Sequence, residues 1–267
     1  MKKYTGIYQA TKKDGTRYFR AGITYKGKHI SLGSFSTDID ANHAYLEAGA
    51  ILSASPGAAS FLPDSYTPEI LSFEKCVTLM NFRDHNLYIK NPIYIKNGFF
   101  FYYYTQDIVY TFDIDDLFYF ASHKLMKRGG HLFVADYGSQ LNILNRYGIR
   151  SFAVEGRDYY FANKDSHDFR YSNIICINPY FGVTRIHKNG SFLYQAKIHI
   201  NGNYHIGIYD SAVEAAIAYN KAVDHVKKQG FSRNYVFNYI DGMSPSEYAA
   251  IYSACQISEK LQTIKFD

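Results

Sequence analysis

The stretch from Tyr160 to Ile174 concentrates side chains that could do chemistry. Its polar groups include the carboxylate of Asp168, the guanidinium of Arg170 and the amides of Asn163 and Asn173. A guanidinium can hold a phosphate group, whereas a single amide binds a divalent cation only weakly. The preceding residues are Tyr160 and Phe161, and neither a phenol nor a phenyl ring is a good ligand for a hard cation. The pattern predicts a loop that holds the fold or touches phosphate.

Residues 4–52 predict three strands followed by a helix. Strand-like segments at 4–10, 18–25 and 29–33 are separated by the turn signals Lys13-Asp14-Gly15 and Lys26-Gly27. Thr37, with Asp40 three residues later, predicts the start of the helix. Its buried face follows at helical spacing, with Ala41, Ala44, Tyr45, Ala48 and Leu52.

Side-chain alternation in the middle strand divides this sheet into two faces. Phe19, Ala21, Ile23 and Tyr25 form an apolar face that suits the helix. The other face and its rim are polar and basic, with Arg17, Tyr18, Arg20, Lys26, Lys28 and His29.

Residues 181–226 repeat this plan, which indicates two copies of one module. The segment Gln195-Ala196-Lys197-Ile198 corresponds to Arg20-Ala21-Gly22-Ile23. The pair Asn201-Gly202 corresponds to Lys26-Gly27, and we expect it to form a two-residue hairpin turn. Ser211 and Glu214 predict the second helix start. The outward strand positions are again polar, with Arg185, Lys188, Gln195, Lys197, His199, Asn203 and His205.

The repeated module resembles the ethylene-response-factor (AP-two type) DNA-binding domain. The resemblance is carried by Leu32-Gly33-Ser34-Phe35 and Glu214-Ala215-Ala216-Ile217-Ala218-Tyr219. It implies three antiparallel strands on one helix, with the open sheet face in the major groove of double-stranded DNA. Arginines there would read guanine, and other basic groups would hold phosphate. The chain departs from the family in lacking tryptophan, with Tyr18 or Tyr194 in its place.

The segment between the modules predicts a linker and a mixed middle region. Residues 55–72 are rich in Ser, Pro and Gly and are expected to be a linker. Strands are expected at 87–95, 98–104, 108–112 and 131–137, with helices at 117–127 and 142–148.

This middle region resembles the HNH core of homing endonucleases from phages and mobile elements. Asn163, Asp168, Arg170 and Asn173 match the family's loop, while Tyr160-Phe161 stands where the family has Asp-His and Asn145 where it has His. The resemblance implies two strands and a helix around one divalent metal. Because the general base and a ligand are replaced, we expect no catalytic residue, no metal or other cofactor and no nuclease activity. His167, His123 and His131 are the candidates that could substitute.

The expected fold class is therefore α+β. The expected domains are a DNA-binding module (1–54), the linker (55–72), a degenerate HNH-like domain (73–180), a second module (181–240) and a C-terminal helix (241–267). That helix is expected from Ser244 to about Leu261, with Tyr248, Ile251, Tyr252 and Cys255 facing the body.

The composition limits the partners and the cellular location that we expect. The 267 residues include 27 Tyr, 20 Phe and three Cys, with a net charge of +5. This balance tolerates nucleic acid as a partner. With no signal region and no apolar run long enough for a membrane span, we expect a cytoplasmic protein, in the host cell if phage-encoded.

Three functions follow as hypotheses. The first is a double-stranded DNA-binding protein derived from an HNH homing endonuclease without nuclease activity. The second is a phage inhibitor, of the anti-CRISPR or anti-restriction kind, that acts on a host defence nuclease complex. The third is an active metal-dependent HNH endonuclease.

Overall fold

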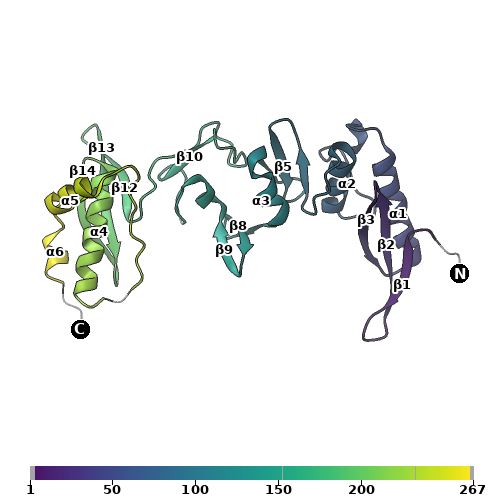
Figure 1. Cartoon of the computed structure of the whole chain (residues 1–267), viewed down its shortest axis with the longest axis horizontal. Helices are drawn as coiled ribbons and strands as arrows, with labels where there is room; N and C mark the ends of the chain where they lie inside the picture. The colour runs from purple at the N-terminus through teal and green to yellow at the C-terminus, as the bar shows by residue number, and fades with distance from the viewer. Residues whose placement is uncertain (1–3, 152, 232, 265–267) are drawn as a thin grey trace. The chain divides into compact units, whose positions relative to one another are not determined.

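The structure is a computed structural model that describes residues 4–151, 153–231 and 233–264, and its chain divides into two units (Figure 1). The first unit comprises Met1–Leu141 with Asp165–Asn173, and the second comprises Asn142–Lys164 with Ile174–Asp267. Both combine short antiparallel sheets with helices, which confirms the expected α+β class. None of the helices in the described residues is long and apolar enough to cross a membrane.

The first unit begins with a three-stranded antiparallel sheet in the order β1-β2-β3. Its strands are β1 (Ile7–Thr11), β2 (Arg17–Tyr25) and β3 (Lys28–Phe35). Lys26 and Gly27 join β2 to β3 with φ values of 45° and 75°, as a two-residue hairpin turn requires. The register shifts at Ala21 and Gly22, which marks a bulge.

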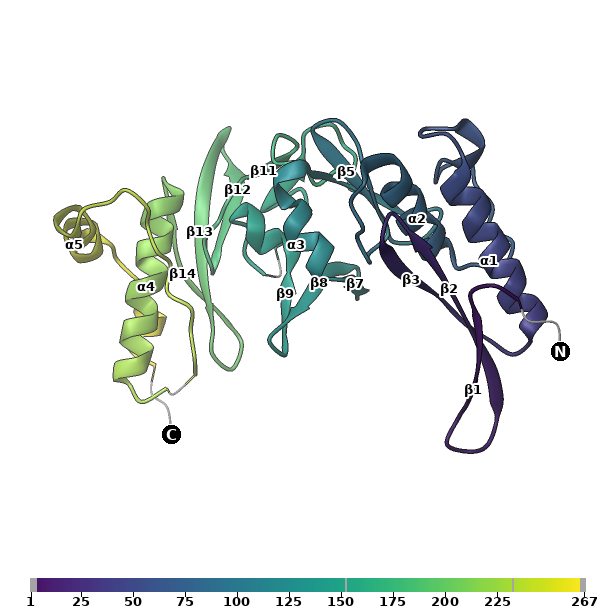
Figure 2. The same cartoon turned by 45° about the vertical axis from the view of Figure 1, so that its right-hand side comes forward.

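Helix α1 (Asp38–Ser53) covers one face of this sheet (Figures 1 and 2). It begins where the sequence predicts, because the Thr37 side chain accepts a hydrogen bond of 3.0 Å from the Asp40 backbone N–H. The predicted helix face is confirmed: Ala41, Ala44, Ala48 and Leu52 are buried, and Tyr45 is partly buried. The strands contribute Phe19, Ala21, Ile23 and Tyr25 to the same core.

Residues 55–72, which the sequence presents as a linker, pack into this core. They include the 3₁₀ helix η1 (Ala59–Phe61), and their packed apolar side chains are Phe61, Leu62, Tyr66, Ile70 and Leu71. The physical reason is the carboxylate of Glu47, which is only 6% exposed. It accepts hydrogen bonds of 2.8–2.9 Å from the Tyr66 hydroxyl and from the backbone N–H groups of residues 69–71. One buried carboxylate therefore fixes the segment.

The same core continues into helix α2 and the next sheet. Helix α2 (Phe73–His85) packs against α1 and β4, and the sheet has the order β4-β5-β6. Its strands are β4 (Ile93–Ile95), β5 (Phe99–Tyr103) and β6 (Val109–Asp113). Cys76, Leu79 and Met80 share one buried cluster with α1. The expected domain boundary at residue 73 thus falls inside a continuous core.

A third small sheet completes this unit, in the order β7-β8-β9. The elements are η2 (Ile114–Asp116), α3 (Leu117–Ser122), β7 (Leu125–Arg128), β8 (His131–Asp136) and β9 (Ser139–Asn142). The helix expected at 117–127 is wrong beyond Ser122. His123 is extended, and the Leu125 N–H donates to the Tyr102 hydroxyl at 3.0 Å, so the chain turns into a strand that pairs with β8.

Residues 165–173 return to the first unit and attach to β6. The Thr111 N–H donates to the His167 carbonyl at 2.9 Å, and the Phe169 N–H donates to the Thr111 carbonyl at 2.8 Å. The ring of Phe169 stacks on Phe112 with centroids 5.5 Å apart. This aromatic packing gives the segment its anchor.

The second unit begins with short elements. They are the 3₁₀ helix η3 (Ile143–Tyr147), which Gly148 ends as predicted, and the two-stranded ribbon of β10 (Tyr159–Phe161) and β11 (Ile174–Cys176). Next comes a three-stranded sheet of β12 (Val183–Lys188), β13 (Ser191–His199) and β14 (Asn203–Tyr209). Helix α4 (Ala212–Lys228) covers one face of it, with Ser211 as N-cap (Figures 1 and 2).

The second sheet-and-helix module repeats the first in detail. Its bulge lies at Ala196 and Lys197, the positions that correspond to Ala21 and Gly22. The carbonyl of Gly182 accepts the Lys197 N–H, as the carbonyl of Gly6 accepts the Gly22 N–H. The two-residue turn expected at Asn201-Gly202 is wrong, because His199 pairs with Asn203 and the loop has three residues. Ile200 is 3% exposed, and its burial draws it out of the strand into the core.

The C-terminal part packs onto α4. It consists of helix α5 (Pro245–Ala254) and helix α6 (Glu259–Gln262), so the single helix expected to about Leu261 is wrong. The chain turns at Cys255, where the Lys221 ammonium donates to the carbonyls of Tyr252 and Cys255 at 2.7 and 2.6 Å. The predicted helix start at Ser244 is confirmed, and Ser244 and Glu247 form a capping box there. The packed face of Tyr248, Ile251, Tyr252 and Cys255 is confirmed as well.

Candidate nucleic-acid interface

The first candidate surface is the face of the β1–β3 sheet that points away from α1; we call it the first open face. Ala21 and Ile30 are buried under α1, so the side chains that alternate with them point to the open face. Together with Tyr8 from β1, these side chains are Tyr18, Arg20, Thr24, His29 and Ser31. Tyr8 lies opposite Arg20 and is 64% exposed. Sequence reasoning missed Tyr8, although its alternation with Ile7 places it on this face.

Hydrogen bonds arrange the polar groups of the first open face. The Arg20 guanidinium donates to the Tyr18 hydroxyl at 3.0 Å, and its Cζ lies 5.5 Å from the centre of that ring. His29 Nδ1 lies 3.4 Å from Thr24 Oγ1, and the His29 ring covers Gly22, where an added Cβ would approach it to 2.9 Å. The structure thus brings three predicted residues together, namely Tyr18, Arg20 and His29.

The other predicted basic residues of this module lie elsewhere. The Lys26 ammonium bonds to the Asn86 side chain and lies 5.1 Å from the ring centre of Tyr25, and the Lys28 ammonium lies 5.4 Å from that of Tyr88. Both lysines therefore turn toward the end of α2. Arg17 lies two residues before Phe19 in β2, so strand alternation places its side chain on the face that α1 covers. Strand alternation and aromatic contacts thus remove these residues from the open face.

The second open face is the side of the β12–β14 sheet away from α4. Its side chains are Thr184, Ile186, Lys188, Ser191, Leu193, Gln195, Lys197, His199, Asn203, His205 and Ile208. His199 Nδ1 lies 3.0 Å from Asn203 Oδ1, a cross-strand pair at the place that Thr24 and His29 occupy in the first module. Gln195 stands where the first module has Arg20.

Arg185 is the exception among the predicted residues of the second module. Arg185 follows Thr184, which lies on the open face, so its own side chain points to the other side of the sheet. It pairs with Tyr194, which packs against the core under α4. Its guanidinium stacks over the Phe192 ring at 4.6 Å from the centroid. Arg185 therefore lies on the helix side of the sheet.

The charged side chains in the strands of both sheets are all basic. None of their six strands contains Asp or Glu. The two open faces instead carry Arg20, Lys188 and Lys197 together with histidines. An anion that approaches either face meets no strand carboxylate.

The polar loop between β10 and β11 is held by internal hydrogen bonds as well as by its attachment to β6. The Asp168 carboxylate, 3% exposed, accepts hydrogen bonds from Arg170 Nε and Nη2 at 2.9 and 2.7 Å. This hydrogen bonding raises the pKa of Arg170. The Asn173 amide donates to the Asp168 carbonyl at 2.8 Å. These contacts are consistent with the fold-holding alternative for Asp168, Arg170 and Asn173, and contact with phosphate stays a prediction.

The seven positions of the HNH resemblance are divided between the two units. Asp168, Arg170 and Asn173 belong to the first, and Asn145, Tyr160, Phe161 and Asn163 to the second. Phe161 is 5% exposed and Tyr160 is 43% exposed. Asn145 accepts a hydrogen bond from the Ser151 hydroxyl at 3.3 Å.

Metal-binding capacity is limited in the part of the chain that the structure describes. No group of three or more His, Cys, Asp or Glu side chains there could hold a metal ion. After β11 the described chain reaches β12 without a helix, so the ββα arrangement that the resemblance implies lacks its helix at this point. His167 stacks on Tyr110 with centroids 5.2 Å apart, and its Nδ1 lies 3.5 Å from Asp165.

Comparison with protein-family models, curated proteins and solved structures yields no match for this chain. Its function is therefore inferred from the geometry and chemistry of the described residues.

Proposed function

We propose that the chain binds double-stranded DNA through the first and second open faces. The observation that carries the proposal is the absence of Asp and Glu from all six strands, while each open face presents basic side chains. A duplex carries one negative charge per ~1.7 Å of its axis, so such surfaces gain affinity by releasing counterions.

The two faces would contribute differently. The Arg20 guanidinium presents a planar fork of donors, which suits guanine O6 and N7 or a phosphate. At the matching position, Gln195 offers one donor and one acceptor, which suits adenine. Lys188 and Lys197 would hold phosphates without reading sequence. The chain would thus prefer different bases at its two faces.

Descent from an HNH nuclease without retained activity is part of this proposal. Arg170 and Asp168 bond to each other rather than leaving an open carboxylate, and Phe161 stands in place of a general base. The loop would then stabilise the fold, and DNA contact would belong to the sheets.

The test is fluorescence anisotropy with a labelled duplex at 50 and 200 mM salt. Arg20→Ala and Lys197→Ala should each weaken binding about tenfold, because each removes a phosphate or base contact of about 1–3 kcal/mol. The matched controls are Lys28→Ala and Arg185→Ala, which remove the same charge from the helix side and should change affinity less than about twofold. Absence of duplex binding at 50 mM salt would refute the proposal.

A protein-binding role is the second candidate, and exposed aromatic side chains favour it. Phe118 is 85% exposed and Tyr137 is 102% exposed in the first unit, and Tyr239 is 82% exposed in the second. Aromatic residues are enriched at protein interfaces. Stoichiometric inhibition of a purified host defence nuclease complex, without duplex binding, would favour this role over the first.

A further inference from the structure

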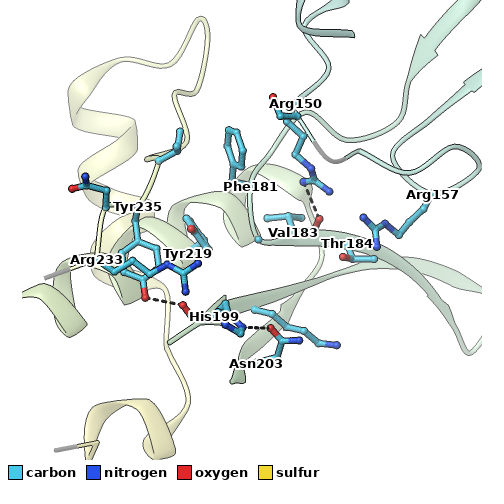
Figure 3. Close-up of a pocket in the computed structure, with 15 residues that line it drawn as sticks. Arg150, Arg157, Phe181, Val183, Thr184, His199, Asn203, Tyr219, Arg233 and Tyr235 are labelled. Atoms are coloured by element: carbon cyan, nitrogen blue, oxygen red, sulfur yellow. Dashed lines mark hydrogen bonds between the residues drawn. The ribbon is translucent and has the colours of Figure 1, made fainter. Parts of the chain in front are cut away.

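A pocket with a volume of about 390 Å³ opens within the second unit beside the start of β12 (Figure 3). Three parts of the chain that are distant in sequence line it. They are Arg150, Ser151 and Arg157; the residues 181–184 with Lys197, His199 and Asn203; and the residues 233–236 after α4. Tyr219 of α4 contributes a further wall. Its volume lies within the range of about 300–1,000 Å³ that small-ligand sites occupy.

The charge of the pocket is strongly positive. Arg150, Arg157, Lys197 and Arg233 line it, and no Asp or Glu is among its described lining residues. Asp158, the residue after Arg157, has a side chain with no exposed surface and forms ion pairs with Arg150 and Arg157. Its carboxylate accepts from Arg150 Nη2 at 2.6 Å and from Arg157 Nη2 at 2.7 Å.

These ion pairs orient the arginines without closing the pocket. The Arg150 side chain is only 8% exposed and also donates to the Val183 carbonyl at 3.3 Å, so it forms a fixed wall. The Arg157 side chain remains 44% exposed. Lys197 is exposed on the second open face. Arg157, Lys197 and Arg233 therefore leave cationic surface for a ligand.

An aromatic wall faces this charge. Figure 3 shows Tyr219 and Tyr235 beside Arg233 on one side of the pocket, with Arg150 and Arg157 on the other. The Tyr235 hydroxyl donates to the His199 carbonyl at 2.8 Å, which fixes its ring. Asn203 and Asn234 add side-chain amides to the lining. Flat aromatic groups next to several cations match a molecule that joins a planar ring to a phosphate.

We propose that this pocket binds a nucleotide, with its phosphate at Arg157, Lys197 and Arg233 and its base on the Tyr235 side. The ligand is either a free mononucleotide or the phosphorylated end of a nucleic-acid strand, since both present the same chemistry. The pocket overlaps the edge of the second open face, with which it shares Thr184, Lys197, His199 and Asn203. The nucleotide proposal nevertheless differs from duplex binding, because its phosphate contacts include Arg157 and Arg233, which lie outside both sheets.

The experiment is isothermal titration of the full chain with four probes: inorganic phosphate, dAMP, a 5′-phosphorylated single-stranded oligonucleotide and its 5′-hydroxyl twin. We expect dAMP to bind at least tenfold more tightly than phosphate. Lys197→Ala and Arg233→Ala should each weaken dAMP at least tenfold. Both residues are exposed, so their variants should keep the wild-type melting temperature. The matched control is Lys228→Ala, an exposed lysine of α4 in the same unit and outside the pocket, which should leave dAMP binding unchanged.

The probes also distinguish the source of the nucleotide and the two proposals. Tighter binding of the 5′-phosphorylated oligonucleotide than of its twin, lost in Lys197→Ala, identifies a strand end as a ligand. Equal affinity for phosphate and dAMP would overturn the nucleotide assignment. Binding of neither, or dAMP binding unchanged in both pocket variants, would overturn the site itself. Arg20→Ala separates the proposals, because it should weaken duplex binding and leave dAMP binding intact.

Discussion

The ring of Tyr219 occupies the space that a Cβ atom on Gly182 would need. Gly182 also has a φ of 72°, a conformation that glycine adopts without strain. The first module repeats this relationship between Tyr45 and Gly6, whose φ is 73°. A glycine before the first strand and a tyrosine on the helix thus fix how each helix sits on its sheet.

Gly182→Ala should destabilise the second unit by about 3 kcal/mol, because left-handed strain of about 1–2 kcal/mol adds to the cost of overpacking against Tyr219. Urea unfolding measured by circular dichroism checks this. The matched control is Gly190→Ala, since Gly190 has a φ of 78° but nothing within 4 Å of an added Cβ. It should cost only the strain, about 1–2 kcal/mol. Equal losses for the two variants would show that the Tyr219 contact contributes nothing.

Glu47 supports a pH-dependent prediction. Burial alone would raise the pKa of this carboxyl, but hydrogen bonds from the backbone of residues 69–71 and from Tyr66 outweigh burial and hold the pKa below its usual 4.5. A carboxyl with a depressed folded-state pKa contributes stability above pH 4.5, and that stability is lost as the pH falls through the folded value. Glu47→Gln should therefore cost about 2 kcal/mol at pH 7.

Thermal unfolding from pH 7 to pH 3 tests the Glu47 prediction. The difference in stability between the wild type and Glu47→Gln should shrink as the pH falls below 4.5. Glu69→Gln is the control, because the Glu69 side chain is exposed and only its backbone meets Glu47, and it should unfold like the wild type. A pH-independent difference would contradict the linkage.

The repeated modules could be predicted because their information is local. Turn residues, alternation in the strands and helix caps at Thr37 and Ser211 each report on neighbours a few residues away. The structure follows them except at Asn201-Gly202, where the hairpin loop has three residues instead of two. The same local rules also assign Arg185 to the helix side, once its strand is counted from the buried Val183.

What could not be predicted depends on contacts between distant residues. Glu47 organises residues 66–71, which composition alone presents as a linker. The Tyr102 hydroxyl accepts a hydrogen bond from the Leu125 N–H, and helix α3 ends at Ser122. The pocket gathers Arg157, Lys197 and Arg233 from three segments. No spacing rule in the sequence brings such residues together.

Asp158 should be the most sensitive acid of the second unit. Burial alone would raise its pKa, but hydrogen bonds from Arg157 and Val154 and the charges of Arg150 and Arg157 hold the pKa below its usual value. Asp158→Asn leaves the buried Arg150 without its counter-charge and should cost about 3–5 kcal/mol. Urea unfolding at pH 7 measures the loss. Asp210→Asn, at an exposed position of the same unit, should change stability by less than about 0.5 kcal/mol. A loss below 1 kcal/mol for Asp158→Asn, on the order of a surface change, would contradict this role.

The chain should not cleave DNA. Under the proposed HNH descent, Phe161 stands in place of the general base and cannot take a proton. The absence of general-base assistance alone lowers a rate by about 10²–10⁴-fold. Supercoiled plasmid incubated with Mg²⁺, Mn²⁺ or Ni²⁺ should therefore stay intact over the time in which an active HNH enzyme nicks it fully. His167→Ala is the informative variant, because His167 is the histidine nearest the loop's polar groups in sequence and is 48% exposed at its side chain. Nicking by the wild type that disappears in His167→Ala would make this histidine a substitute base and overturn the prediction; nicking that persists would point to a contaminating nuclease.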